Sequence, residues 1–189
     1  IKADSPNGVT ITSSMDLPIE NLTCLDKAIG LYEYTDPKLI MPPWPDSFKG
    51  YAGWPEIYIA GIPLTISRYP NQGFMQADSI IRDGKKPENK ETKQEPPKFL
   101  SAQLTQNYNK ELPLFLNGYW TFKWADEIIR VDSINPQSGE IELAAPHNYG
   151  MGAPSGGLFY AINQPEYVDT ENEYYYNPKT GTLRFIHSF

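Results

Sequence analysis

The sequence predicts an all-β fold: a small, mostly antiparallel β-barrel or sandwich with long loops and little helix. Several short runs alternate between apolar and polar residues, which is the period of a half-buried strand. The 18 prolines and 14 glycines interrupt the chain too often for long helices. The 13 tyrosines, 8 phenylalanines and 4 tryptophans belong to the residue types that strands favour. Together these observations indicate many short strands joined by turns.

The length of 189 residues fits one domain, so we expect a single all-β domain over residues 1–189. A chain of this length buries a sizeable core without disulfides. It begins at Ile1 without a methionine and stops just after a strand-like run. We therefore expect it to be a piece of a larger protein.

Charge and composition exclude several classes of function. The net charge of −7 argues against nucleic-acid binding, which depends on clustered lysine and arginine. A single cysteine, Cys24, leaves no internal disulfide and no cysteine-based zinc site. The two histidines, His147 and His187, lack the spacing of a metal motif. We therefore expect no metal and no cofactor. No membrane span is expected either, because no apolar run approaches the roughly 18–20 residues that cross a bilayer.

The first part of the chain contains two predicted strands and one ambiguous segment. Residues 9–14 and 30–34 are rich in β-branched or aromatic residues and are predicted to be strands. Residues 19–29 have apolar side chains at spacings of three, three and four, which fits a short amphipathic helix. A strand pair broken at Asp26-Lys27 fits this segment equally well, so both alternatives stay open. Residues 41–54 contain three closely spaced prolines and are predicted to form a stiff loop.

Residues 54–74 are predicted to form the β-hairpin around which the rest of the chain is organised. Isoleucine and leucine alternate with other residues on both sides of Ala60-Gly61. Gly61 can adopt the positive φ that a tight hairpin turn requires. One apolar face of the hairpin should therefore pack on a core, and a second turn at residues 69–73 should close it.

The second half of the chain is predicted to contain two hairpins of similar design. Residues 128–143 and 173–186 each consist of two apolar runs around a five-residue turn. Both turns have proline at the second position and glycine at the last, which supply the backbone angles that such turns need. The remaining expectations are a strand at 75–82, a mobile charged loop at 84–97, and short apolar stretches at 99–104, 112–116 and 158–160.

Three motifs resemble a known protein family. Residues 56–73 (EIYIAGIPLTISRYPNQG) resemble a hairpin found in large secreted bacterial proteins that contain a right-handed parallel β-helix. Gly118-Tyr119-Trp120, followed by Trp124-Ala125-Asp126, resembles a later motif of the same proteins. Residues 172–185 resemble their closing hairpin. The motifs keep their order and together cover most of the chain.

This family is related to glycoside hydrolases of the fucosidase and galactosidase kind. The resemblance implies a β-barrel-like domain inserted in the β-helix, with the flanking β-helix as its partner. It also implies that the catalytic carboxylates lie on coils of the β-helix, which this chain lacks. The implied location is a bacterial one: secreted, periplasmic or at the cell surface.

The sequence contains no complete catalytic set, so no catalytic residue is assigned. Glycoside hydrolysis needs two carboxylates about 5–10 Å apart. The candidate pairs by proximity are Asp126 with Glu127, Glu171 with Glu173, and Asp132 with Glu140. Adjacent residues of a strand face opposite sides, which counts against the first pair. Whether the protein is an enzyme stays open, and a hydrolase formed by this piece alone is the least favoured interpretation.

Aromatic side chains are the candidates for binding a sugar. A rigid, exposed ring stacks on the C–H face of a sugar through apolar contact. The stacking candidates are Trp44, Tyr51, Trp54, Tyr119 and Trp120. Each tryptophan is alternatively a core residue, and this interpretation is favoured for Trp120 and Trp124.

The resulting hypothesis is a non-catalytic accessory domain of a secreted carbohydrate-active β-helix enzyme, flanking its glycan cleft. An oligo- or polysaccharide would be the ligand and the flanking β-helix the partner. The alternative is a structural or protein-interaction module of a cell-surface protein that has no role in sugar binding.

Overall fold

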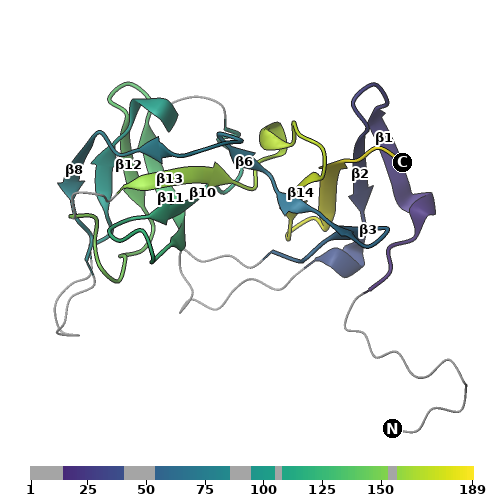
Figure 1. The fold of residues 1–189 in the computed structure, drawn as a ribbon, viewed down its shortest axis with the longest axis horizontal. Coiled ribbons are helices and arrows are strands. Elements are labelled where there is room, and N and C mark those ends of the chain that lie inside the picture. Colours follow the sequence, from purple (N-terminus) through teal and green to yellow (C-terminus); the bar gives the residue numbers. More distant parts are fainter. Residues whose placement is uncertain (1–14, 41–53, 86–94, 105–107, 153–156) are drawn as a thin grey trace, which may run out of the picture.

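The computed structural model describes residues 15–40, 54–85, 95–104, 108–152 and 157–189. Over these residues the fold is all-β, as predicted, with mostly antiparallel sheets. The strands form a larger lobe and a smaller lobe that lie side by side (Figure 1). The C-terminus lies in the smaller lobe.

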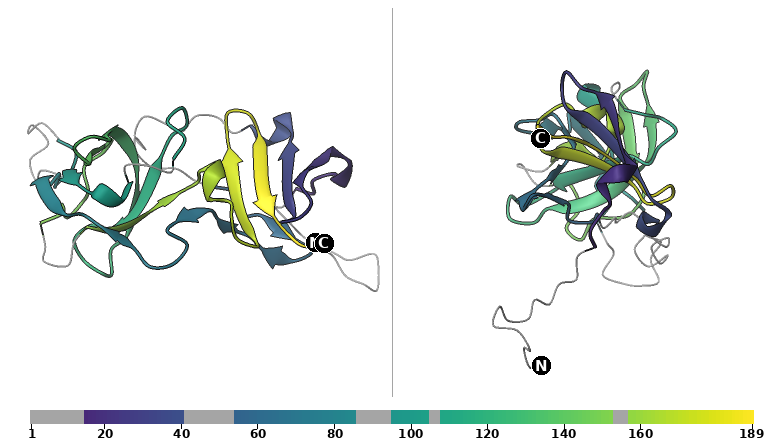
Figure 2. Two further views of the ribbon diagram at one scale, coloured as in Figure 1. Left: turned by 90° about the horizontal axis from the view of Figure 1, so that it is seen from above. Right: turned by 90° about the vertical axis from the view of Figure 1, so that its right-hand side faces the viewer.

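The larger lobe is an antiparallel sheet that curls around a core (Figure 2). In spatial order its strands are β6 (Arg68–Tyr69), β13 (Leu158–Ile162), β10 (Phe115–Tyr119), β11 (Glu127–Asn135), β12 (Glu140–Leu143), β9 (Lys98–Leu100) and β8 (Ser79–Arg82), and β7 (Met75–Gln76) also pairs with β13. Within the described residues the end strands β6 and β8 do not pair with each other. The sheet is therefore curled without forming a closed barrel.

Three large aromatic rings occupy the core of the larger lobe. Phe99, Trp120 and Phe159 are completely buried. The rings of Trp120 and Phe159 stack with centroids 5.9 Å apart and planes inclined by 16°, and Phe99 contacts both. Each such ring removes a large apolar area from water, so these rings are among the main contributors to the stability of this lobe.

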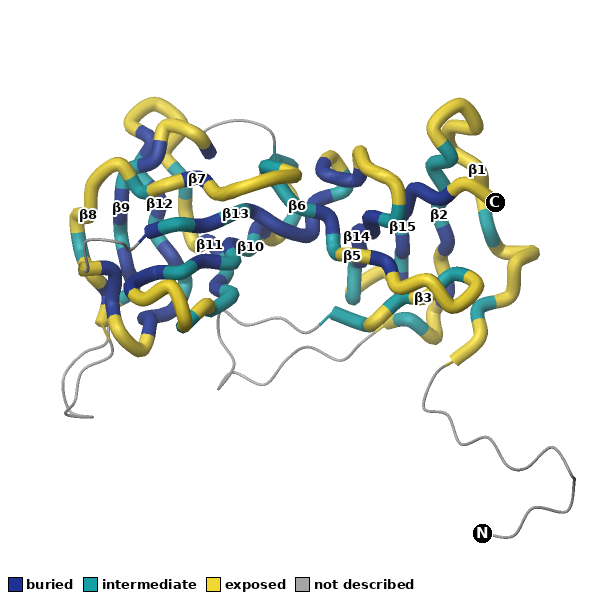
Figure 3. The backbone as a smooth tube through the Cα atoms, in the orientation of Figure 1, coloured by how far each residue is buried: buried dark blue, intermediate teal, exposed yellow. Residues whose placement is uncertain are grey.

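The smaller lobe is a five-stranded sheet that carries apolar side chains on both faces. In spatial order its strands are β1 (Leu22–Asp26), β2 (Leu31–Thr35), β15 (Thr182–Ile186), β14 (Glu173–Asn177) and β5 (Thr65–Ile66). Neighbouring strands are antiparallel except for β5, which runs parallel to β14. Figure 3 shows that β14 and β15 are largely buried, whereas the edge strand β1 is exposed.

Helical structure in the described residues consists of short 3₁₀ segments. These are η1 (Ile19–Asn21), η2 (Pro37–Leu39), η4 (Ala102–Leu104) and η5 (Pro165–Tyr167). A helix long and apolar enough to cross a membrane does not occur in the described part of the chain.

Both hairpins predicted for the second half of the chain are confirmed as β11–β12 and β14–β15. Their turns end at Gly139 and Gly181, whose φ values of 74° and 67° lie in the left-handed region that favours glycine. A Cβ atom added to Gly181 would lie 2.2 Å from the carbonyl oxygen of Asp36. This turn therefore requires glycine for its conformation and for its contact with the neighbouring segment.

Residues 54–74 contain the predicted tight turn, but they also connect the two lobes. The two-residue strands β3 (Tyr58–Ile59) and β4 (Ile62–Pro63) pair around Ala60 and Gly61, whose φ values are 49° and 81°. Beyond this small hairpin, β5 joins the smaller lobe and β6 joins the larger lobe. Partners more than 90 residues away in the sequence determine this course (Thr65 pairs with Glu173, Arg68 with Ile162), which local patterning does not reveal.

Residues 19–29 contain a short strand instead of an amphipathic helix. The segment η1 leads directly into β1, which pairs with β2 after a turn. Leu25 and Ile29, which the apolar face of a helix would have buried, are exposed. The helix alternative is therefore wrong, and of the predicted strand pair one strand lies in this segment: it ends at Asp26, and its partner begins at Leu31.

Residues 75–82 form two strands, β7 and β8, where the sequence predicted one. The predicted strand at 9–14, the proline-rich loop up to residue 53 and positions 86–94 of the charged loop lie outside the described residues.

Candidate functional site

Strand β10 separates the core of the larger lobe from a candidate binding surface. Leu116 and Gly118 are buried on the inner face, whereas Phe115, Asn117 and Tyr119 are half-buried on the outer face. This alternation follows from the two-residue period of a strand. The outer face therefore presents two aromatic rings and one amide along a single strand.

Three further aromatic side chains extend this outer face. Trp54 contacts Phe115 edge to face, with ring centroids 5.2 Å apart and planes inclined by 89°. Tyr160 lies on β13 opposite Asn117, and the ring of Phe74 lies 5.7 Å from the rings of both Tyr160 and Tyr119. We call this row of five rings the aromatic strip: Trp54, Phe115, Tyr160, Phe74 and Tyr119.

Arg68 holds the middle of the aromatic strip in place. Its guanidinium carbon lies 3.7 Å from the centre of the Tyr160 ring and 5.9 Å from that of Phe74, which is cation–π geometry. The Arg68 Nε donates to the carbonyl of Pro70 at 3.0 Å, and Nη2 donates to the carbonyl of Gly73. Arg68 thus fastens the turn after β6 against β13.

A cleft opens at the Trp54 end of the aromatic strip, where the two lobes meet. Its volume of about 340 Å³ falls within the range of small-molecule sites. We call it the inter-lobe cleft. Aliphatic side chains from both lobes form part of its wall, and its aromatic and polar lining consists of Trp54, Glu56, Tyr58, Asn117, Tyr160 and Tyr174.

Hydrogen bonds orient the polar groups of the inter-lobe cleft. Asn117 Nδ2 donates to Tyr160 Oη at 2.7 Å, and Tyr58 Oη donates to Glu56 Oε2 at 3.0 Å. Tyr174 Oη donates to a backbone carbonyl at 2.7 Å. Burial raises the pKa of Tyr174, and the hydrogen bond to Glu56 raises the pKa of Tyr58, so both phenols stay protonated. Among the described lining residues, Glu56 is the one acidic side chain, and none is basic.

Two of the five predicted stacking residues lie at the ends of the aromatic strip. Trp54 is half-buried and lines the inter-lobe cleft, and Tyr119 is half-buried at the opposite end. The strip therefore joins residues that the sequence singled out separately. Trp44 and Tyr51 lie outside the described residues.

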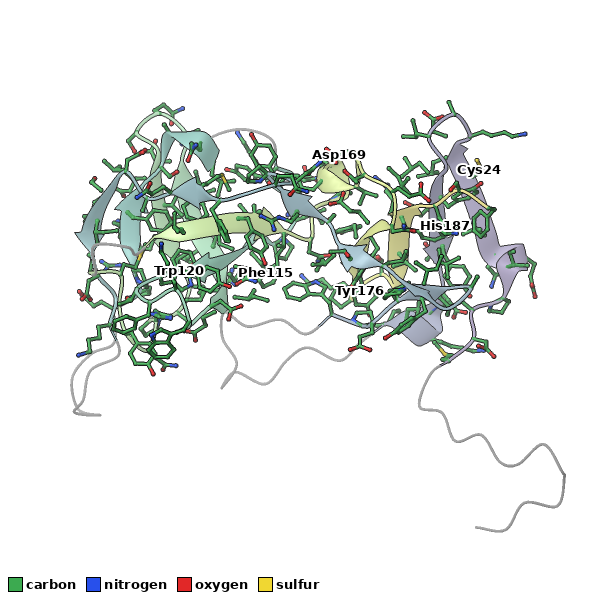
Figure 4. The ribbon with its side chains drawn as sticks, viewed as in Figure 1. Cys24, Phe115, Trp120, Asp169, Tyr176 and His187 are labelled. Atoms are coloured by element: carbon green, nitrogen blue, oxygen red, sulfur yellow. The ribbon has the colours of Figure 1, made fainter. Side chains whose placement is uncertain are left out.

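Trp120, which lies within the larger lobe (Figure 4), is not available for stacking on a sugar, because its side chain is completely buried. Its Nε1 donates to the carbonyl of Glu127 at 2.8 Å. The ring also packs against Gly118, where an added Cβ would lie 2.6 Å from Trp120 Cε2. Trp120 is two residues after Gly118 and four after Leu116, so it points to the same inner face of the sheet and is a core residue.

Trp124 was favoured as a core residue, and this prediction is wrong: its side chain is 70% exposed. The chain turns after Thr121, with the N–H of Ala125 donating to the carbonyl of Phe122 at 3.1 Å. Strand parity therefore ends before Trp124. Recognising a turn at residues 122–125 would have identified Trp124 as exposed. The sequence does not reveal this turn, because these four residues include no proline, glycine or asparagine.

Glu171 and Glu173, one of the candidate carboxylate pairs, have separate structural partners. Glu171 Oε1 accepts from the N–H and the Oγ of Ser188 at 2.8 and 2.9 Å, and these bonds lower its pKa. Glu173 is buried, which raises its pKa, and its Oε2 accepts from the N–H groups of Asp169 and Thr170 at 3.4 and 3.2 Å. Both carboxyls are thus engaged by the fold itself.

The other two carboxylate pairs are divided as well. Asp126 is exposed, whereas the Glu127 side chain is only 10% exposed and its Oε2 lies 3.1 Å from Nε2 of the buried His147. Burial raises the pKa of Glu127. Asp132 and Glu140 each lie beside a basic side chain instead of facing each other. Over the described residues, no set of three histidine, cysteine, aspartate or glutamate side chains converges to hold a metal.

Comparison with known proteins gives limited information. No protein-family profile matches the sequence, and no curated protein is significantly similar to it. A solved structure described as "Glycoside hydrolase" is similar in fold, with a TM-score of 0.49 and 11% sequence identity. The similarity covers 84% of this chain and 26% of that one, so this chain spans about a quarter of its length. At this identity and TM-score the likeness concerns only the path of the backbone.

Proposed function

We propose that this chain is a non-catalytic accessory domain that binds carbohydrate for a secreted carbohydrate-active β-helix enzyme. The observation that carries the proposal is the inter-lobe cleft, which has Trp54 in its wall and the aromatic strip leading away from it. The three sequence motifs that resemble bacterial β-helix proteins supply the context of a larger enzyme.

The chemistry of the inter-lobe cleft suits a neutral sugar. Apolar ring faces are provided by Trp54 and Tyr160, and hydrogen-bonding groups by Asn117, Glu56 and Tyr58. Sugar binding needs both kinds of surface, because a pyranose has apolar C–H faces and a rim of hydroxyl groups. The carboxylate of Glu56 disfavours anionic ligands.

The length of the aromatic strip favours an oligosaccharide over a single sugar. Phe115 and Tyr119 are four residues apart on β10, which corresponds to about 13 Å at the rise of a strand. Trp54 extends the row beyond Phe115 into the cleft. A surface of this length is longer than one pyranose ring, so several sugar units would contact it.

A non-catalytic role is supported by the separate partners of the candidate carboxylates. Glu171 and Glu173 are held by backbone and hydroxyl groups of the fold, and Glu127 faces a buried histidine. Glu56, the acid in the cleft, has the phenol of Tyr58 as its partner. Catalysis in the parent protein would therefore reside outside this chain.

The proposal is tested by measuring oligosaccharide binding to the chain. A glycan array identifies a ligand, and titration calorimetry then compares the wild type with Trp54→Ala. We expect the variant to bind about tenfold or more weakly, because an aromatic anchor at a binding surface contributes more than its neighbours. Phe189→Ala is the matched control, since Phe189 is an exposed aromatic residue outside the cleft. An unchanged affinity of Trp54→Ala, or no glycan bound at all, would refute the proposal.

A groove on the smaller lobe favours a second candidate function, docking onto the flanking β-helix. This groove has a volume of about 860 Å³ and is lined mainly by apolar residues, of which Met15, Ile19, Tyr58 and Phe189 are also exposed. Apolar area of this kind is typical of protein interaction sites. The chain would then serve as a structural module of the parent protein.

The docking function is tested in the parent protein by replacing Ile19 or Phe189 with aspartate. If the groove docks on the β-helix, these changes should separate the unfolding of the domain from that of the β-helix in calorimetry. A single unchanged transition would exclude the docking function and leave the sugar-binding function unaffected.

A further inference from the structure

A second group of aromatic side chains lies exposed at the end of the larger lobe's sheet, in the connection between β10 and β11 and the loop after β12. Phe122, Trp124 and Tyr149 are 39%, 70% and 44% exposed. The rings of Phe122 and Trp124 stack with centroids 5.1 Å apart and planes inclined by only 9°. Tyr149 contacts both edge to face, at 5.4 and 5.5 Å. We call these three residues the Trp124 platform.

The Trp124 platform is anchored at Tyr149 by a buried polar side chain. His147 is almost completely buried, and its ring contacts that of Tyr149 at 5.9 Å. The N–H of Tyr149 donates to His147 Nδ1 at 3.2 Å, while Nε2 lies 3.1 Å from Glu127 Oε2. The N–H of His147 itself donates to the carbonyl of Gly84 at 3.0 Å. Tyr149 is therefore positioned by the fold itself, and its contacts with Phe122 and Trp124 join those rings to this support, which lowers the entropic cost of binding.

The exposed area of the platform is too small for a stable protein interface. An aromatic side chain buries about 150–250 Å² when it is fully covered, so the exposed parts of these three rings amount to roughly 300 Å². A stable protein complex buries about 800 Å² on each partner. A surface of this size, with one open indole face, instead matches one or two sugar rings.

The surroundings of the platform point to a neutral ligand. Lys123 and Asp126 flank Trp124 in the chain, and both are exposed. Their opposite charges favour neither an anionic nor a cationic ligand. They are a hydrogen-bond donor and an acceptor close to Trp124 in the chain, and the hydroxyl rim of a sugar uses groups of both kinds.

We propose that the Trp124 platform is a second carbohydrate-binding site, at which the open face of the Trp124 indole stacks on a pyranose ring of a polysaccharide. Phe122 covers the other face of the indole and Tyr149 supports its edge. The site is formed by residues other than those of the inter-lobe cleft, so it does not depend on sugar binding in the cleft.

The test uses insoluble polysaccharides whose sugar rings expose flat C–H faces, namely microcrystalline cellulose and insoluble xylan. Depletion isotherms are measured for the wild type, Trp124→Ala, Tyr149→Ala and Trp54→Ala. We expect Trp124→Ala to bind at least one polymer about tenfold or more weakly than the wild type. Trp54→Ala should retain the binding that Trp124→Ala loses, which separates this site from the cleft.

A second measurement uses the wild-type protein and does not depend on the folding of a variant. Acrylamide quenches exposed indoles, so Trp124 should dominate the quenchable fluorescence among the described tryptophans. Soluble cello- or xylo-oligosaccharides should protect it from quenching.

Three results would overturn the proposal. The first is equal polymer binding by the wild type and Trp124→Ala. The second is an absence of binding to both polymers, together with unprotected quenching. The third is a concentration-dependent dimer of the wild type that Trp124→Ala abolishes, because the platform would then serve self-association.

Discussion

The side chain of Asn163 pairs with the backbone of Tyr176 as if it were a neighbouring strand. Asn163 Nδ2 donates to the Tyr176 carbonyl and Oδ1 accepts from the Tyr176 N–H, both at 2.9 Å. Asn163 follows β13 of the larger lobe, whereas Tyr176 lies in β14 of the smaller lobe. Strand β5 pairs with β14 only as far as Ile66 and Tyr174, so the amide of Asn163 satisfies the edge of β14 beyond that point. One side chain thereby connects the two lobes that form the inter-lobe cleft.

Replacing Asn163 with alanine should destabilise the fold by about 3 kcal/mol, because two buried backbone groups of Tyr176 lose their partners. Asn163 also has a φ of 59°, a conformation that alanine tolerates poorly. Asn163→Gly is the matched control, since glycine relieves the backbone cost while the hydrogen bonds remain lost. Urea denaturation should therefore rank the stabilities as wild type, then glycine, then alanine. Equal stability of all three proteins would show that water replaces the amide.

The sequence was most informative where structure depends on local chemistry. The turns ending at Gly139 and Gly181 were predicted from their own residues, and so was the turn at Ala60-Gly61. The parallel pairing of β5 with β14 was not predicted, because it joins Thr65 to Glu173 through contacts that no local pattern encodes. The division of the strands into two lobes depends on the same long-range pairing.

The candidate site was predicted only in part, for a related reason. Trp54 and Tyr119 were selected for their type, and the structure places both in the aromatic strip. Phe74 and Tyr160 were missed, because only the pairing of β13 with β10 and β7 brings them to that face. Trp120 and Trp124 are four residues apart and of the same type, yet one is buried and the other exposed. Trp120 is buried because it continues the alternation of inward-facing residues that starts at Leu116. Trp124 is exposed because the chain turns after Thr121.

The contact between Gly118 and Trp120 predicts a strong steric effect. An alanine at position 118 would place its Cβ 2.6 Å from Trp120 Cε2, inside a core ring that stacks on Phe159. We expect Gly118→Ala to lower the free energy of unfolding by about 1–3 kcal/mol. Gly152→Ala is the control, because among the described residues its Cβ would meet nothing closer than 3.8 Å and its φ is not in the left-handed region. The control should change stability by less than about 0.5 kcal/mol. Thermal or urea unfolding of the two variants checks the prediction, and equal effects would contradict it.

Glu142 should stabilise the fold at neutral pH and lose this effect in acid. It forms ion pairs with Lys98, at 3.0 Å, and with Arg82, and Lys98 is the main cause of its lowered pKa. A carboxyl whose pKa is lower in the folded state than in the unfolded state stabilises the fold above its unfolded pKa. This contribution disappears as the pH falls through the folded pKa.

Glu142→Gln should therefore cost about 0.5–1 kcal/mol at neutral pH. Urea denaturation at pH 7 and at pH values well below 4.5, the ordinary value for glutamate, should show a cost that shrinks in acid. A cost that does not change with pH would contradict the prediction.

Glu173 should show the opposite dependence on pH, although it is also a glutamate on a strand. Burial raises its pKa, and the N–H groups of Asp169 and Thr170 reduce this shift without reversing it. Below the unfolded pKa the carboxyl is protonated in both states and its burial carries no charge penalty. As the pH rises through the folded pKa, the folded state must bury a charge that the unfolded state exposes to water, so stability falls.

The variant Glu173→Gln separates this charge effect from the loss of hydrogen bonds. Its amide cannot reproduce every acceptor contact of the carboxylate, but that cost is the same at all pH values. The difference in unfolding free energy between the wild type and Glu173→Gln should therefore decrease as the pH is raised from below 4.5 to 7. Chemical denaturation across this range measures the slope, and Glu142→Gln in the same series should give a slope of the opposite sign. If the stability of the wild type instead increases relative to Glu173→Gln as the pH rises, the hydrogen bonds from the Asp169 and Thr170 N–H groups lower the pKa of Glu173 by more than burial raises it.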